Sequence, residues 1–114
     1  MLKIKRVYDS VEEDDGQRFL VDRLWPRGIK KSALTIDGWI KDAAPSTELR
    51  QWFHHDPSRW NEFRLRYFAE FESKPEVLEP LAELQRDGTV TLLCSAKNTN
   101  RNHAIALMEF LKAH

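Results

Sequence analysis

The sequence contains few cysteines, no excess of charge of one sign and no long apolar run. Its single cysteine, Cys94, cannot form a disulfide within the chain, so a disulfide-stabilised fold is excluded and a reducing cytoplasm is expected. No apolar segment is long enough for a signal peptide or a membrane-spanning helix. The 18 basic residues balance the 18 acidic ones, which argues against binding to nucleic acid or to an anionic membrane.

Glycine is also scarce, and its distribution excludes the common nucleotide-binding loops. The four glycines are isolated, at Gly16, Gly28, Gly38 and Gly88. Neither a phosphate-binding loop nor a dinucleotide-binding fingerprint can be built from single glycines. The side chains that could hold zinc are Cys94, His54, His55 and His103. No pair of them has the spacing usual for zinc ligands, so the sequence predicts neither a metal nor a cofactor.

The acidic run from Glu12 to Gly16 does not form a calcium-binding loop. With Gly16 at the glycine position of such a loop, the first ligand position falls on Val11, which offers no side-chain oxygen. We therefore predict a solvated turn.

What the sequence does contain is typical of an α/β domain of residues 1–114. Residues 89–94 form a short apolar run with β-forming side chains, which predicts a strand buried on both faces at the centre of a sheet. Further strands are predicted near residues 2–8, at residues 18–24 and around Trp39. The predicted fold is a three-layer α/β domain with a small, mostly parallel sheet and helices on both faces.

Several helix signals surround these strands. Ser46 is placed to cap a first helix, and Asp56 with Pro57 begins a second one. In the second helix, aromatic residues recur every three or four positions, which predicts a stripe that faces the core. The stripe consists of Trp60, Phe63, Tyr67 and Phe71. A third helix should begin late because of Pro80, and helical spacing returns from Ala104.

Polar side chains follow two of the predicted strands. They are Asp22, Arg23, Trp25 and Arg27 after the second strand, and Ser95, Lys97, Asn102 and His103 after the strand at residues 89–94. Open α/β sheets bind ligands at the carboxyl ends of their strands, where the next helix begins. These side chains therefore predict one composite site at that edge of the sheet.

The charges of this site favour a small anionic or phosphorylated ligand. Arg23, Arg27 and Lys97 can neutralise a phosphate or carboxylate, and arginine does so with two parallel hydrogen bonds. Ser95 and Asn102 can add hydrogen bonds to the same ligand.

Asp22 or His103 would act as acid or base if a reaction occurs, and Trp25 supplies an indole at the same strand end. A simpler interpretation stays open, in which Asp22 pairs with an arginine and Trp25 fills the core. A Ser-His-Asp arrangement of Ser95, His103 and Asp22 lacks the nucleophile-elbow motif that would support it.

Cys94 invites comparison with the cysteine phosphatases and rhodaneses, whose catalytic arginine follows the cysteine after five or four residues. Here six residues separate Cys94 from Arg101, and the loop contains no glycine that would let its amides converge. We therefore predict a buried, unreactive cysteine.

Five specific motifs extend over almost the whole chain. They are Asp22-Arg23-Leu24-Trp25-Pro26-Arg27-Gly28, Pro45-Ser46-x-Glu48-Leu49-Arg50, Phe63-Arg64-x-x-Tyr67, Leu92-Leu93-x-Ser95-Ala96-Lys97-Asn98 and Asn102-His103-Ala104. The chain resembles, through these motifs, the YeaO-like branch of the bacterial family called domain of unknown function four-eight-eight. The resemblance implies a compact cytoplasmic α/β protein and no settled activity.

The same resemblance bears on Cys94. In close relatives this position is often tyrosine, whereas the wider family tends to carry a cysteine here and a Cys-His-Arg string at the last helix. The matching string in this chain is Asn102-His103-Ala104, so the resemblance implies that chemistry requiring the second cysteine or the arginine is absent.

The residues leave two classes of function open. One is a pocket for a small anion, with or without acid-base chemistry. The other is a regulatory or nucleic-acid-associated module, against which the zero net charge and the absence of a helix-turn-helix pattern argue.

Overall fold

The computed structural model describes residues 1–113 and contains one four-stranded parallel sheet in that part of the chain. The strands are β1 (Leu2–Arg6), β2 (Gln17–Leu20), β3 (Gly38–Trp39) and β4 (Val90–Cys94), in the order β1-β4-β2-β3. All five residues of β4 are buried, as the continuous apolar run predicts. The predicted α/β class, the small parallel sheet and the central position of β4 are confirmed.

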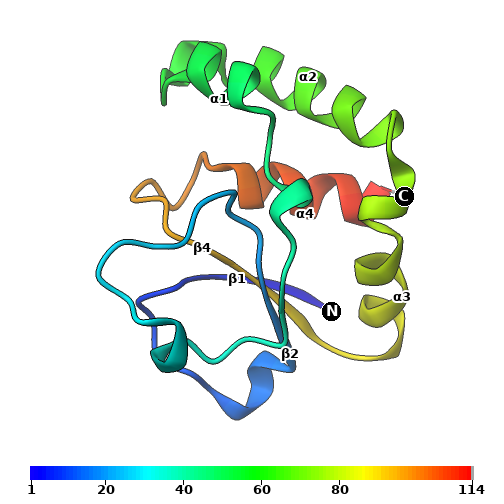
Figure 1. The fold of residues 1–114 in the computed structure, drawn as a ribbon. Coiled ribbons are helices and arrows are strands. Elements are labelled where there is room, and N and C mark those ends of the chain that lie inside the picture. The colour runs from blue at the N-terminus through cyan, green and yellow to red at the C-terminus, as the bar shows by residue number, and fades with distance from the viewer. Residues whose placement is uncertain (114) are drawn as a thin grey trace.

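The α-helices are α1 (Thr47–Phe53), α2 (Trp60–Glu72), α3 (Glu79–Asp87) and α4 (His103–Ala113). In Figure 1, α4 lies between the sheet and the pair formed by α1 and α2, and α3 stands beside them. Ser46 caps α1 as predicted, because its hydroxyl accepts a hydrogen bond of 3.1 Å from the Leu49 N–H. Helix α3 begins late, at Glu79, with Pro80 in its first turn.

The main core lies between the sheet and these four helices. Phe63, Tyr67 and Phe71 of α2 are 1%, 0% and 1% exposed and Trp60 is half-buried against the same core, so the predicted aromatic stripe faces the core. Apolar residues of β4, including Leu92, belong to the same cluster.

The second face of the sheet has a lighter cover than the expected helical layer. Val7, Leu20, Leu34 and Leu93 form a small apolar cluster there, with Trp25 and Trp39 among the side chains packed against it. The segment between β2 and β3 supplies much of this cover, and its regular structure is the short 3₁₀ helix Lys31–Ala33. No α-helix of the described residues contributes to this cluster.

The acidic turn before β2 differs from the predicted solvated turn. Asp15 is 1% exposed, and its carboxylate lies between the Lys5 ammonium at 3.0 Å and the Arg18 guanidinium at 2.5 Å. The ion pairs and a backbone hydrogen bond outweigh burial and hold the pKa of Asp15 far below 3.8. Glu12 and Asp14 stay exposed, so only part of the turn is solvated.

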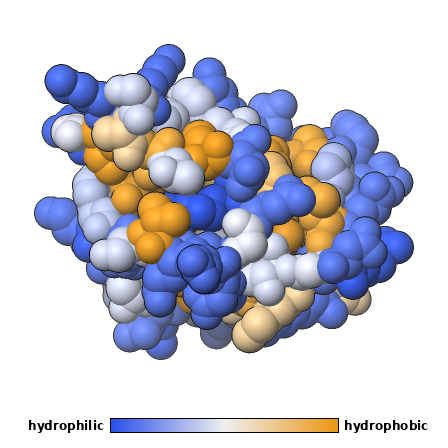
Figure 2. Space-filling model, turned by 90° about the horizontal axis from the view of Figure 1, so that it is seen from below, coloured by the Kyte–Doolittle hydropathy of each residue, from blue (hydrophilic) through white to orange (hydrophobic). Residues whose placement is uncertain are grey.

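The carboxyl ends of β1, β2 and β4 meet at one edge of the sheet. Arg6 is opposite Cys94, and Leu20 is opposite Leu93, so the chain leaves all three strands at nearly the same level. Strand β2 ends at Leu20 rather than at the predicted Leu24, because the following residues turn into the site. From below, the surface is mostly hydrophilic with separate hydrophobic patches (Figure 2). No helix among residues 1–113 is long and apolar enough to cross a membrane.

Candidate functional site

A cavity of about 630 Å³ opens at the carboxyl edge of the sheet. All eight side chains predicted for the site line it, from the segment after β2 and from the loop and helix after β4. They are Asp22, Arg23, Trp25, Arg27, Ser95, Lys97, Asn102 and His103. The parallel sheet brings them together, because two strand ends more than 70 residues apart in sequence lie side by side.

Asp22 connects the two halves of the site. Its Oδ2 atom accepts hydrogen bonds from the backbone N–H and the hydroxyl of Ser95, at 2.9 and 2.7 Å. Its Oδ1 atom is buried and lies 3.0 Å from Nε2 of His103. Burial acts to raise the pKa of Asp22, but the hydrogen bonds and charge of His103 together with Ser95 outweigh it and hold the pKa below 3.8. Asp22 is therefore a carboxylate at neutral pH.

The positions of these atoms decide the tautomer of His103. Nε2 lies 3.1 Å from the backbone oxygen of Val21, with hydrogen-bond geometry, and 3.0 Å from Asp22 Oδ1, without it. Both neighbours are acceptors, so Nε2 is the ring nitrogen that carries a proton.

The Ser95 hydroxyl is not arranged as a nucleophile. It donates its proton to Asp22 and not to His103, so the histidine does not activate it as a general base would. The three residue types of a catalytic triad are present, but the carboxylate stands between the other two. Ser95 holds Asp22 in place.

Asn102 lines the cavity, but its side-chain oxygen and nitrogen are both hydrogen-bonded within the protein. Its Oδ1 accepts a hydrogen bond of 3.0 Å from the Ile105 N–H, as a helix N-cap does, and its Nδ2 donates to the Asn98 carbonyl at 2.9 Å. At 6% exposure it presents little surface to a ligand. These contacts give Asn102 a structural role in capping α4. Its role in ligand binding stays a prediction.

Four cationic side chains line the cavity, against one carboxylate. They are Arg23, Arg27, Arg50 and Lys97, and the carboxylate is Asp22. The Arg23 guanidinium contacts the carbonyl oxygens of Ala44 and Pro45 at 3.4 Å. Within residues 1–113, none of the four cations forms an ion pair with a carboxylate. The wall of the cavity therefore carries an excess of positive charge.

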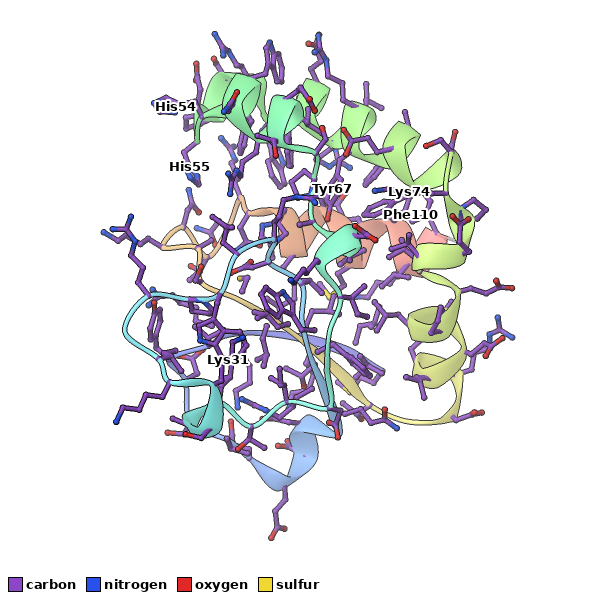
Figure 3. All side chains as sticks on the ribbon, in the orientation of Figure 1. Lys31, His54, His55, Tyr67, Lys74 and Phe110 are labelled. Atoms are coloured by element: carbon purple, nitrogen blue, oxygen red, sulfur yellow. The ribbon has the colours of Figure 1, made fainter. Side chains whose placement is uncertain are left out.

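Helix α1 also contributes to this wall, which was not predicted from the sequence. Arg50, Phe53 and His55 line the cavity from α1 and the turn after it. Figure 3 shows His55 on the side of that turn facing the loop before α4, and His54 further out. Arg50 falls within a motif that carries the family resemblance, and this was the signal that could have identified it.

Trp25 is held rigidly beside the arginines. Its indole N–H donates to the Ile29 carbonyl at 2.6 Å, and its ring meets Trp39 edge to face with centroids 5.3 Å apart. Trp25 packs against the second apolar cluster, as the simpler interpretation predicts, and it also lines the cavity, while its role in ligand binding stays a prediction.

The family model described as "Inactive DUF488-N3 subclade" matches residues 1–114. The chain belongs to this subclade. It is 47% identical over 112 residues to the uncharacterized protein YeaO of Escherichia coli, covering 98% of this chain and 97% of the relative. It is 42% identical over 110 residues to the uncharacterized protein Rv3073c of Mycobacterium tuberculosis, covering 96% and 92%. No solved structure matches the chain.

In this DUF488-N3 protein the cysteine of β4 is a core residue. Cys94 is 1% exposed, and burial raises the pKa of its thiol from 9.0 to about 11. A thiolate nucleophile needs both exposure and a lowered pKa, and Cys94 has neither. The predicted burial of Cys94 is confirmed.

Proposed function

We propose that this protein is a cytoplasmic binding protein for a small organic anion, which it holds in the cavity without chemical conversion. The observation that carries the proposal is the charge of the wall. Four cations and one carboxylate line the cavity, in a chain whose formal net charge is zero. Such a local excess attracts phosphate and carboxylate groups.

The single carboxylate does not cancel this attraction. Its one negative charge, on Asp22, which is 7% exposed, faces the four positive charges of Arg23, Arg27, Arg50 and Lys97, so the wall keeps an excess of positive charge. Arg27, Arg50 and Lys97 are exposed and have no carboxylate partner within residues 1–113, so they can turn toward a ligand without breaking an ion pair. Arginine suits this task because its planar group can donate two parallel hydrogen bonds to one anionic group.

The contacts of the polar groups favour binding over catalysis. The lowered pKa of Asp22 makes it a weak base, and the Ser95 hydroxyl is bonded to that carboxylate. The Cys94 thiol is buried and protonated. The word "inactive" in the description of the subclade agrees with this proposal.

Calorimetric titration with 1-naphthyl phosphate at low salt tests the proposal. We expect Arg27→Gln and Arg50→Gln each to weaken binding by about tenfold, because a hydrogen bond to a charged group is worth about 1.5 to 3 kcal/mol. Arg101→Gln is the matched control, since it removes the same charge from an exposed residue outside the cavity wall.

The control variant should bind like the wild type. Absence of binding, or equal affinity of the wild type and both cavity variants, would contradict the proposal.

A further inference from the structure

We infer that the ligand is amphiphilic, with a planar apolar body joined to one anionic group. This inference rests on the proposed function and specifies the chemical class of the anion. Three features of the cavity support it: its size, its apolar wall and the order of residues along the segment after β2.

The size of the cavity exceeds what an anionic group needs. A volume of about 630 Å³ falls within the range of about 300 to 1,000 Å³ typical of pockets for drug-sized ligands. A phosphate or carboxylate alone would leave most of this space to water. The cavity therefore fits a ligand with a substantial body beside its charge.

The wall that would meet this body is mostly apolar. Its apolar members are Leu24, Trp25, Pro26, Pro45, Phe53 and Phe63. Three of their rings are fixed before any ligand arrives. Trp25, held by its hydrogen bond to Ile29, is the ring of the three that presents surface to a ligand. Phe53 and Phe63, at 6% and 1% exposure, stack with centroids 4.3 Å apart and support the wall from the core. Rigid aromatic walls bind flat apolar groups with little loss of entropy.

In the segment after β2, two arginines flank a run of three apolar residues. Arg23 and Arg27 bracket Leu24, Trp25 and Pro26, and all five residues line the cavity. Leu24 is 64% exposed, so a large apolar side chain faces water beside two guanidiniums. A ligand that covers Leu24 places its own body within a few residues of the arginines.

The test compares three probes by calorimetry: 1-naphthyl phosphate, glycerol 3-phosphate and 1-naphthol. The first has both a ring and a phosphate, the second lacks the ring, and the third lacks the phosphate. We expect 1-naphthyl phosphate to bind at least about tenfold more tightly than either of the others, because burying a ring adds apolar contact.

Leu24→Ser and Leu65→Ser form a matched pair for this test. Both leucines are exposed, at 64% and 68%, but Leu65 lies on α2 and does not line the cavity. We expect Leu24→Ser to weaken binding of 1-naphthyl phosphate by about three- to tenfold, and Leu65→Ser to leave it unchanged. Urea unfolding checks that both variants are folded.

The possible results separate this inference from the proposed function. If 1-naphthyl phosphate and glycerol 3-phosphate bind with equal affinity and the arginine variants weaken the binding of both, the proposed function stands. The inference that the ligand is amphiphilic is then contradicted. Equal affinity for 1-naphthol and 1-naphthyl phosphate would show that the anionic group contributes nothing to binding, and this result would contradict both proposals. If no probe binds, both proposals fail.

Discussion

At the scale of single residues, Asp22 organises the site. Its carboxylate joins the segment after β2 to Ser95 after β4, and it lies against His103 at the start of α4. A buried carboxylate is stable only when donors surround it. Asp22 is therefore a positioning residue, which holds Ser95 after β4 against the segment after β2.

Asp22→Asn tests this role. The amide would present an N–H₂ group either to the Ser95 donors or to the His103 N–H, and two donors facing each other leave a buried group unpaired. We expect a loss of about 1 to 3 kcal/mol in the free energy of unfolding, measured with urea at neutral pH. Asp87→Asn, at an exposed position, serves as the control. Equal unfolding midpoints for the two variants would disprove the role.

The pH dependence of the same variant has a defined sign. The pKa of Asp22 is lower in the folded protein than its ordinary value of 3.8, so the carboxylate stabilises the fold above that value. This contribution is lost as the pH falls through the lower, folded-state pKa. The difference in unfolding free energy between wild type and Asp22→Asn should therefore shrink below about pH 4.

The effect of Cys94 on stability has the opposite pH dependence, because it lowers the free energy of unfolding as the pH rises. Its folded-state pKa of about 11 exceeds its ordinary value of 9.0, so the unfolded chain loses the thiol proton first as the pH rises. We expect the wild type to lose about 2 to 3 kcal/mol of stability between these two values, relative to Cys94→Ala. Urea unfolding at a series of pH values measures this. Parallel profiles for the two proteins would show that the thiol is not buried.

At the scale of elements, α2 fixes the start of α1 and the segment just before it. The Tyr67 hydroxyl donates to the Ala43 carbonyl, and the Glu70 carboxylate accepts hydrogen bonds from the Ser46 N–H and hydroxyl at 2.9 and 2.5 Å. The start of α1 is thus fixed by α2, and α1 in turn carries Arg50 to the cavity. Figure 3 shows Tyr67 between α2 and the layer below.

Phe63→Ala tests the packing of α2. Phe63 is 1% exposed and stacks on Phe53, so its removal leaves a cavity in the main core. We expect a loss of about 3 to 5 kcal/mol in unfolding free energy. Leu65→Ala on the exposed side of α2 should change it by less than about 0.5 kcal/mol. Unchanged urea midpoints for both variants would place the aromatic stripe outside the core.

At the scale of the whole molecule, positive charge is neutralised on one side and left unpaired on another. On the second face of the sheet, Lys5 and Arg18 are paired with Asp15. At the cavity, Arg27 and Lys97 have no such partner within residues 1–113. The zero net charge therefore conceals a local site for anions.

Salt dependence distinguishes this local site from a nucleic-acid surface. We expect affinity for 1-naphthyl phosphate to fall by less than about tenfold between about 50 and 200 mM salt, because one anionic group is bound. A protein that contacts six to ten phosphates of a nucleic acid loses a factor of about 10³ to 10⁵ in affinity over that range. Tight binding of duplex DNA with such a steep loss would favour the nucleic-acid-associated alternative.

The sequence by itself determined the central strand, the aromatic stripe and the edge of the sheet where the cavity lies. Each of these follows from local patterns: the unbroken apolar run of residues 90–94, the recurrence of aromatics in α2, and polar residues directly after strands. Parallel pairing then brings two strand ends together, so all eight predicted residues reach one cavity. Their roles in binding or catalysis remain predictions.

Only the tertiary structure decided which polar groups are hydrogen-bonded or ion-paired within the protein and which are exposed to a ligand. Asn102 is used as a helix cap, Asp15 is buried by ion pairs, and Arg50 reaches the cavity because α2 fixes the start of α1. These outcomes depend on contacts between residues distant in sequence, and a local pattern does not encode distance in space. The sequence supplies the chemical groups, and long-range packing decides which of them remain without a partner.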